Sequence, residues 1–304
     1  MTLSDDVKAG KQLAAMTVGL SLECCGFGNK RMGDLREVRT DADKARLTLH
    51  KTLLKNKALS QIDAHDWQTQ KHIRELALPS YFKDGTYRMP LALVSEVDTY
   101  LNERLAERRE LVEAFRPEYP KAIADAQAHL GPQFRAADYP TADAMVGRIS
   151  MEWFWFELDG VPASVAAMNG QAASRARRRL NEKLAQLVGD VERRLTADVQ
   201  ALIGEMLEKL AGKGDGEPKQ FKQGLLLTRI TEYLRTYEAR LGTMFPDLTA
   251  EIAKLRGVLG SVDLEDAKRN LGTQVTFHEQ LADVSKAIDN LMVTRGRRAI
   301  TLED

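Results

Sequence analysis

Hydrophobic residues recur at steps of three and four through about forty residues, from Gln171 to Lys213. The stripe consists of Leu180, Leu184, Leu187, Val188, Val191, Leu195, Val199, Leu202, Ile203, Met206, Leu207 and Leu210. This spacing places the side chains on one face of an α-helix, which at 1.5 Å per residue is about 60 Å long. Such a helix needs a partner of similar length, in the same chain or in a second copy.

A pattern of period two predicts a β-strand from Ala15 to Cys24, where apolar and small or polar residues alternate. A second strand is predicted from Ile149 to Leu158, which is rich in aromatic residues on both faces. We expect both of its faces to be covered and the two strands to pair, because unpaired backbone groups are unfavourable. A third, short strand is predicted at Thr86–Met89, after the turn Asp84-Gly85.

Most of the remaining chain has helical spacing. The helix predicted over 91–130 should kink or break at Pro117 and Pro120, because proline lacks the backbone N–H that a helix interior requires. A flexible turn follows the long helix at 212–218. The other predicted helices span 41–53, 60–78, 221–241, 247–259 and 264–292.

These elements predict a mainly α fold with a small α+β head built on a short β-sheet. The head comprises residues 12–90 and 131–165. The two long helices, 91–130 and 166–213, are expected to pair as an antiparallel helical hairpin or coiled-coil stalk, since their lengths match. The C-terminal helices, within 217–294, should pack along this stalk as further members of a bundle.

Composition excludes several classes of protein. Hydrophobic residues make up 43% and charged residues 29%, which is typical of a folded chain rather than a disordered one. Lys+Arg and Asp+Glu are both 44, so a general nucleic-acid binder with a basic surplus is not expected. The start of the chain is polar and acidic, and no apolar run approaches the roughly 20 residues that cross a bilayer. We therefore expect a cytoplasmic protein that does not enter a membrane.

No catalytic, cofactor-binding or metal-binding set emerges from the motifs. The loop Gly26–Arg31 follows a strand but has Arg31 where a dinucleotide loop needs glycine, and no triphosphate-binding pattern occurs. The five histidines lack metal-ligand spacing. Cys24 and Cys25 are adjacent, so a bond between them would be strained, and two reduced thiols are expected. An enzyme that uses the Cys24–Arg31 loop remains a minor alternative.

Two clusters have more than one interpretation. Arg175, Arg177, Arg178 and Arg179 crowd the start of the long helix, where cations oppose the helix dipole. They could bind a phosphate backbone or an acidic partner, or form a solvated face balanced by nearby acids. The run 153–156, Trp-Phe-Trp-Phe, could be an exposed docking surface or the buried core of the head.

Three segments together resemble a domain family of unknown function that occurs in bacteria, phages and mobile elements. They are Val18-Gly-Leu-Ser-Leu22 with its glycine turn, Leu78-Pro-Ser followed by Gly85-Thr-Tyr-Arg-Met-Pro90, and Asp138-Tyr-Pro140 followed by Met151-Glu-Trp-Phe-Trp-Phe-Glu-Leu158-Asp-Gly-Val-Pro162. The resemblance covers about residues 15–165. Members are often encoded near MoxR-type AAA+ ATPases and proteins with a von Willebrand factor A (VWA) domain. The resemblance implies such a partner and assigns no catalytic residue.

The leading hypothesis is a non-enzymatic, phage- or mobile-element-type interaction protein, an adaptor or assembly component. It would self-associate into a homo-oligomer, or dock a partner such as a MoxR-type AAA+ ATPase or a VWA-domain protein, through the stalk. The alternative is a nucleic-acid-binding protein that uses the Arg175–Arg179 cluster. Sequence leaves open whether the stripe is covered within the chain or between chains. The residues predicted to form the self-association stripe are Leu180, Leu184, Leu187, Val191, Leu195, Leu202 and Met206.

Overall fold

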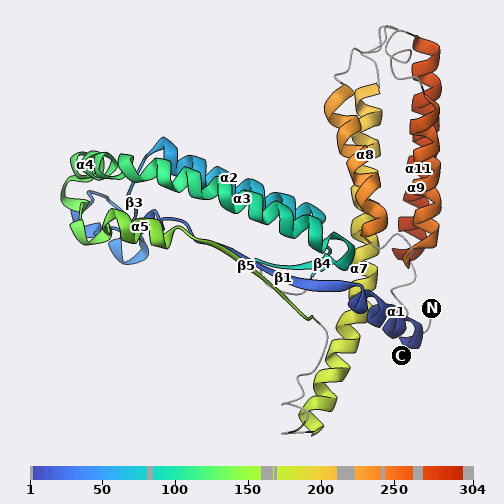
Figure 1. Ribbon diagram of the computed structural model, residues 1–304, viewed down its shortest axis with the longest axis horizontal. Helices are drawn as coiled ribbons and strands as arrows, with labels where there is room; N and C mark the ends of the chain where they lie inside the picture. Colours follow the sequence, from blue (N-terminus) through green and yellow to red (C-terminus); the bar gives the residue numbers. More distant parts are fainter. Residues whose placement is uncertain are drawn as a thin grey trace.

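The computed structural model describes residues 3–80, 85–158, 167, 170–210, 223–240, 244–262 and 270–296. Two parts are visible in Figure 1. An arm, made of a small sheet and a helical hairpin, leaves the side of the long helix α7 (Gly170–Leu210). A helical bundle lies along α7 and points away from the arm (Figure 1). The mainly α fold with a small antiparallel sheet and one very long helix is confirmed.

The arm is built on three antiparallel strands in the order β4-β1-β5. The central strand is β1 (Thr17–Cys24), and its neighbours are β4 (Thr86–Pro90) and β5 (Met151–Phe156). Gly19 lies opposite Phe156 in this register. A Cβ atom on Gly19 would lie 2.5 Å from the Phe156 ring, so the close approach requires glycine. All three predicted strands, and the pairing of the first with the aromatic one, are confirmed.

One face of the sheet is covered by a hairpin of two helices, α2 (Lys57–Leu76) and α3 (Val94–Phe115). The side chain of Asn56 caps α2 by accepting from the N–H groups of Ala58 and Leu59. Apolar residues from the sheet and both helices form one core. Its buried members are Leu20, Leu22, Ile73, Leu76, Tyr87, Met89, Leu93, Val97, Leu101 and Met151.

The far end of the arm has a second core. A 3-10 turn at Arg116–Glu118 separates α3 from α4 (Tyr119–Leu130), which confirms the break predicted at the two prolines. The helix α5 (Ala142–Arg148) then leads into β5. A two-stranded ribbon, β2 (Lys30–Met32) with β3 (His50–Thr52), completes this end. The core between them includes Phe27, Leu53, Leu54, Leu59, Ile62, Val112, Phe115, Tyr119 and Met145.

The helix predicted over 41–53 is wrong. This segment contains a 3-10 turn at Lys44–Arg46, capped by Asp43, followed by β3. No residue of the turn is buried. Residues His50–Thr52 pair with β2 as a strand, and Leu53 after them is buried, so the segment forms a ribbon instead of the predicted helix.

The bundle buries the stripe of α7 against four other helices. These are α1 (Leu3–Ala15), α8 (Gln223–Ala239), α9 (Pro246–Ser261) and α11 (Leu271–Gly296). α1 was missed by sequence reasoning because its segment is polar overall. Their shared core contains Leu13, Leu184, Leu187, Val191, Leu195, Val199, Ile203, Ile230, Tyr237, Leu248, Ile252, Leu255, Phe277, Leu281 and Ile288.

The predicted pairing of 91–130 with 166–213 as a stalk is wrong. α3 packs against α2, whereas α7 packs against α1 and α11. The matching lengths misled the prediction, because length alone does not choose between partners. The apolar face of α3 is filled by the sheet and α2, and that of α7 by the terminal helices. The packing of C-terminal helices on α7 is as predicted for α11.

The arm and the bundle meet where α8 passes the base of the helical hairpin. Arg235 of α8 bonds Glu96 of α3 at 2.8 Å and also pairs with Glu232 on its own helix. Arg240, the residue after α8, is buried, and its guanidinium carbon lies 5.6 Å from the centre of the Tyr233 ring.

Among the described helices, none combines the length and the apolar character that crossing a membrane requires.

Candidate functional site

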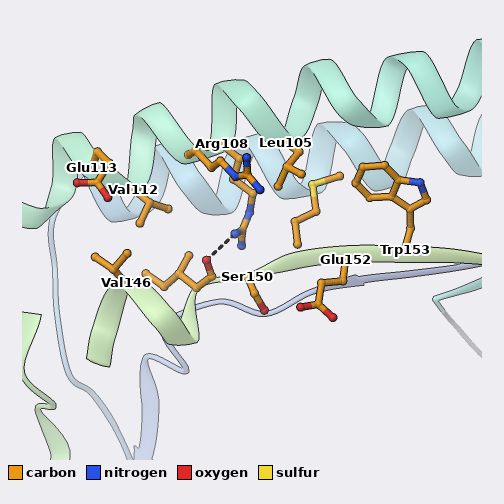
Figure 2. A pocket seen from close by; sticks show the side chains of 11 residues that line it. Leu105, Arg108, Val112, Glu113, Val146, Ser150, Glu152 and Trp153 are labelled. Carbon is orange, nitrogen blue, oxygen red and sulfur yellow. Dashed lines mark hydrogen bonds between the residues drawn. The ribbon is translucent and has the colours of Figure 1, made fainter. Parts of the chain in front are cut away.

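A groove runs between α3 and the segment that carries α5 into β5. Figure 2 shows α3 above it and the start of β5 below it, with side chains from both elements between them. Its volume is about 640 Å³. The lining residues are Leu105, Arg108, Arg109, Val112 and Glu113 from α3, and Val146, Ile149, Ser150, Met151, Glu152 and Trp153 from the opposite side. Six of these eleven residues are apolar and four are charged, so the groove has a mixed lining.

The floor of the groove is the free edge of the sheet. Among the described strands β5 pairs only with β1, so it is an edge strand. The Cys25 N–H donates to the Ser150 carbonyl at 2.8 Å, which fixes the phase of the ladder. In an antiparallel pair alternate residues bond the neighbouring strand, so Glu152 and Phe154 bond β1 whereas Trp153 points its N–H and C=O away. Met151 and Trp155 share that outward phase.

The other edge of the sheet is blocked. Beyond β4, Leu78 forms a bridge with Arg88, and its N–H donates to the Arg88 carbonyl at 2.9 Å. Pro90 ends β4 and has no N–H to offer. β5 has no such protection in the described part of the chain. Open strand edges bind other extended chains readily, so the difference between the two edges marks β5.

Arg108 fixes α3 over the start of β5. Its side chain is 2% exposed and forms a two-point ion pair with Asp66 of α2, at 2.7 and 2.9 Å. The same guanidinium donates to the carbonyls of Ile149 and Cys25 at 2.9 and 3.0 Å, and Figure 2 shows the bond to Ile149. One buried cation therefore ties α2, α3, β1 and β5 together.

Asp98 fixes α3 over the other end of the strand. Its carboxylate accepts from the indole N–H groups of Trp153 and Trp155, at 3.0 and 3.2 Å. These bonds hold the pKa of the Asp98 carboxyl below its usual range. Asp98 and Arg108 are ten residues apart, about 15 Å along the helix. The two contacts set the separation between α3 and β5, so the shape of the groove is built into the arm.

His65 lies beside the Arg108–Asp66 pair. Its ring is buried, and neither ring nitrogen has a hydrogen-bond partner in the described structure. Nδ1 lies 3.5 Å from Asp66, and Nε2 lies 3.6 Å from Glu107. Burial is the main reason that the pKa of His65 is lowered, followed by the charge of Arg104. The neutral imidazole is therefore favoured.

The two thiols are poor nucleophiles. Burial raises the pKa of Cys24 to about 11, and the Asp66 carboxylate adds to the shift. The pKa of Cys25 is also raised, chiefly by its hydrogen bond with Glu23. Both cysteines are free. A reactive cysteine needs a lowered pKa, so this pair does not support the alternative of an enzyme at the Cys24–Arg31 loop.

The aromatic run divides between the two faces of the sheet. Trp153 and Trp155 turn toward α3, where Asp98 holds them. Phe154 is 62% exposed on the opposite face. The prediction that both faces are covered is therefore wrong for Phe154. No described helix covers that face at Phe154, because α2 and α3 pack on the other side.

The stripe predicted for self-association is mostly consumed inside the chain. Leu184, Leu187, Val191, Leu195, Leu202 and Met206 are all buried in the bundle core, and Leu180 is half-buried against it. The reason is that α1 and the C-terminal helices cover the stripe. As a surface for a partner or a second copy, this prediction is corrected.

The arginine cluster lies where the sequence placed it, in the first turns of α7. Arg175, Arg177, Arg178 and Arg179 are all exposed. None of them forms an ion pair with a described residue. Figure 1 shows this end of α7 extending past the arm on the side away from the bundle. The structure does not bring the cluster together with the groove.

Sequence reasoning missed Arg108, Asp66 and Asp98. A signal for Arg108 exists, because it lies three residues after Leu105 and four before Val112, in line with the apolar residues of α3. A charged residue at a core position predicts a buried ion pair.

Among the described residues, no three His, Cys, Asp or Glu side chains lie close enough to hold a metal ion.

Comparison with known proteins gives no relative. No family model matches the chain, and no curated protein or solved structure is significantly similar to it. The resemblance described above therefore stays a prediction. Function has to be argued from the groove and the surfaces of this chain.

Proposed function

We propose that this protein is a non-enzymatic interaction protein, an adaptor or assembly component, that binds an extended segment of a partner protein along the free edge of β5. The observation that carries the proposal is the open edge itself, at the floor of the groove. Trp153 and Trp155, which are half-buried, present their backbone N–H and C=O groups outward, whereas Met151, in the same phase, is buried. Only another extended backbone matches a row of alternating donors and acceptors at strand spacing.

The walls of the groove favour a segment with alternating side chains. Leu105 and Val112 on α3, together with Val146 on α5, form an apolar wall above the edge. Arg109 and Glu113 are exposed at the rim. Side chains of an added strand would alternate between this wall and the face that carries Phe154. The partner segment is therefore expected to be apolar at every second position.

The rigidity of the site also supports binding. Arg108 and Asp98 hold α3 at a fixed distance from β5 before any ligand arrives. A preformed groove loses little conformational entropy on binding, so backbone hydrogen bonds of about 0.5–1.5 kcal/mol each contribute directly to affinity.

We further propose that the partner is a MoxR-type AAA+ ATPase or a VWA-domain protein of the same phage or mobile-element system. Support for this step comes from the sequence resemblance over residues 15–165. The test is affinity purification of the tagged protein from its own host, with and without ATP, followed by mass spectrometry. An ATPase or VWA protein that co-elutes is the expected result. Recovery of the bait alone, as a large homo-oligomer, would favour self-assembly instead.

The site is tested by hydrogen exchange on the complex. Binding at the edge should slow exchange at the amides of Met151, Trp153 and Trp155, whereas those of Glu152 and Phe154 are already protected by β1. Protection confined to the start of α7 or to the bundle would contradict the proposed site.

Variants separate the edge from the exposed aromatic face. Trp153→Phe removes the indole that bonds Asp98 but keeps the backbone N–H, so it is compared with Trp153→Pro, which loses both. Trp153→Pro removes an outward N–H without breaking the ladder to β1, and Val146→Trp fills the groove. Both should weaken binding at least about tenfold, the equivalent of one or two lost hydrogen bonds. Phe154→Ala, which changes the exposed face of the same strand, is the matched control and should bind within about twofold. Circular dichroism establishes that each variant is folded.

A second candidate function is nucleic-acid binding by Arg175, Arg177, Arg178 and Arg179. The observation in its favour is that all four are exposed and lack an ionic partner among the described residues. The zero net charge of the chain argues against it. Salt-dependent retention on DNA that disappears when Arg177, Arg178 and Arg179 become Ala would support this candidate.

A further inference from the structure

A second surface, at the far end of the arm, has a strong charge of its own. We call residues 30–57, which include β2, β3 and the segment between them, the tip hairpin. It contains nine Lys or Arg residues and four Asp or Glu residues, so the rest of the chain has an acidic surplus of five. The neutral composition therefore conceals two regions of opposite sign. Local basic excess of this kind indicates a polyanionic partner.

The base of the tip hairpin is firmly anchored. Lys51 turns inward, where it pairs with Asp138 at 2.7 Å and donates to the Gln133 carbonyl at 2.6 Å. The Gln133 side chain bonds the backbone N–H and C=O of Asp34 at 2.9 and 2.8 Å. On the other strand, the Asn29 side chain bonds the N–H and C=O of Leu54, both at 2.7 Å. The ribbon is therefore held against the arm through Lys51 and Asp34, and its two ends are joined by Asn29.

Most cations of the tip hairpin have no acidic partner among the described residues. Two arginines have carboxylate partners, Arg36 with Asp34 at 2.6 Å and Arg46 with Asp43 at 3.8 Å. Six other cations are exposed and form no ion pair with a described residue: Lys30, Arg31, Arg39, Lys44, Lys55 and Lys57.

One of these cations is held in place. Arg31 Nη1 donates to the carbonyls of Gly28 and Lys30 at 2.8 and 3.1 Å, which orients its guanidinium. Its other N–H groups have no partner in the described structure. A guanidinium fixed by backbone carbonyls with donors to spare is suited to a phosphate group.

We propose that the tip hairpin binds the sugar–phosphate backbone of double-stranded DNA. The residue types select this partner among polyanions. Residues 30–57 include no Phe, Tyr or Trp. Proteins that bind single-stranded nucleic acid stack bases on aromatic rings, and membrane-surface segments use aromatic anchors. Two of the exposed cations, Lys30 and Arg31, lie on β2, and the other four lie in the segments that flank the strands. Such a group of cations without aromatic rings matches the regular phosphates of a duplex.

The test measures binding of the full chain to a short labelled duplex of arbitrary sequence by fluorescence anisotropy. Affinity should fall more than about tenfold between about 50 and 200 mM salt, as expected when several phosphates are neutralised. The triple variant Lys30→Glu, Arg31→Glu and Lys55→Glu should lose at least about tenfold at the lower salt. The matched control, Arg175→Glu, Arg177→Glu and Arg178→Glu, changes the net charge equally and should stay within about threefold.

Several results would overturn the proposal. They are no binding by the unaltered chain at low salt, equal losses in both triple variants, or loss in the control alone, which would move the site to α7. Tighter binding to single strands, to an acidic peptide or to anionic vesicles than to the duplex also contradicts it. The milder variant Lys30→Gln, Arg31→Gln and Lys55→Gln removes the charges without reversing them. It should also weaken DNA binding while staying folded. Trp153→Pro should leave DNA binding unchanged, so failure here and failure at the β5 edge are distinguishable.

Discussion

The arm and the bundle use hydrophobic residues in different ways. In the bundle, the stripe of α7 is covered along its length by helices of the same chain. In the described arm, α2 and α3 cover one face of the sheet, but one strand edge, the rings of Trp67 and Phe154, and a groove remain open. A fully covered core gives stability, whereas unsatisfied backbone and open apolar surface give binding capacity. Under the proposed function, the bundle is the scaffold and the arm carries the recognition surface.

The tryptophans make this comparison measurable. All three, Trp67, Trp153 and Trp155, lie in the arm, and the bundle has none. Tryptophan fluorescence therefore reports on the arm alone, while far-ultraviolet circular dichroism reports on helices in both parts. Comparing the two signals in one urea titration shows which part a substitution affects.

The largest expected effect is that of Val191→Asp. Val191 is 0% exposed in the centre of the bundle core. An unpaired carboxylate there should lower the free energy of unfolding by about 4 kcal/mol or more. The circular dichroism transition should then precede the fluorescence transition in urea. Arg178→Asp, exposed on the same helix, is the control, with an effect within about 0.5 kcal/mol. Coincident transitions for Val191→Asp would contradict the separation of arm and bundle.

The next largest effect is expected for Arg108→Ala, which should lower the free energy of unfolding by about 3 kcal/mol. The substitution leaves the Asp66 carboxylate, which is 13% exposed, without its buried partner. The loss should appear first in tryptophan fluorescence, because Arg108 holds α3 on β5. Arg109→Ala, its exposed neighbour, should change stability by less than about 0.5 kcal/mol. Adding Asp66→Ala to Arg108→Ala should recover part of the loss, and strict additivity would argue against the ion pair.

The smallest effect is the pH dependence contributed by His65. Burial lowers its pKa in the folded state, so below the usual histidine range the unfolded chain binds more protons. The stability that neutral His65 provides is present at neutral pH. It is lost as pH falls from the unfolded pKa, about 6.5, toward the lower folded value. His65→Gln should flatten this part of the fluorescence-detected stability profile.

Some slope should remain in that variant, because burial also lowers the pKa of His72. A profile for His65→Gln that is as steep as that of the unaltered chain would contradict the assignment. The substitution His50→Gln, at an exposed position on β3, is the control and should leave the profile unchanged.

The candidate site was predicted from the sequence only in part. The alternation around Leu20 and the aromatic run at 151–156 predicted two strands. Their pairing followed from the need to satisfy the backbone N–H and C=O groups of both strands. The sequence did not indicate that β5 ends the sheet. Which strand lies at the edge of the sheet depends on how the sheet and α3 pack together. From its length, α3 was predicted to pair with α7 instead. Arg108 shows the same limit, since its position in the apolar stripe is visible but its partner on α2 is not.

The sequence by itself determined several local elements: the 41-residue helix, the three strands of the main sheet, and the break at Pro117 and Pro120. These follow from periodicity and from backbone chemistry that acts within a few residues. Tertiary structure alone decided which apolar faces meet. α1 covers the stripe of α7, α3 rests on the sheet, and the edge of β5 stays open. Hydrophobic burial is not directional, so an apolar stripe predicts that it will be covered but not by which segment.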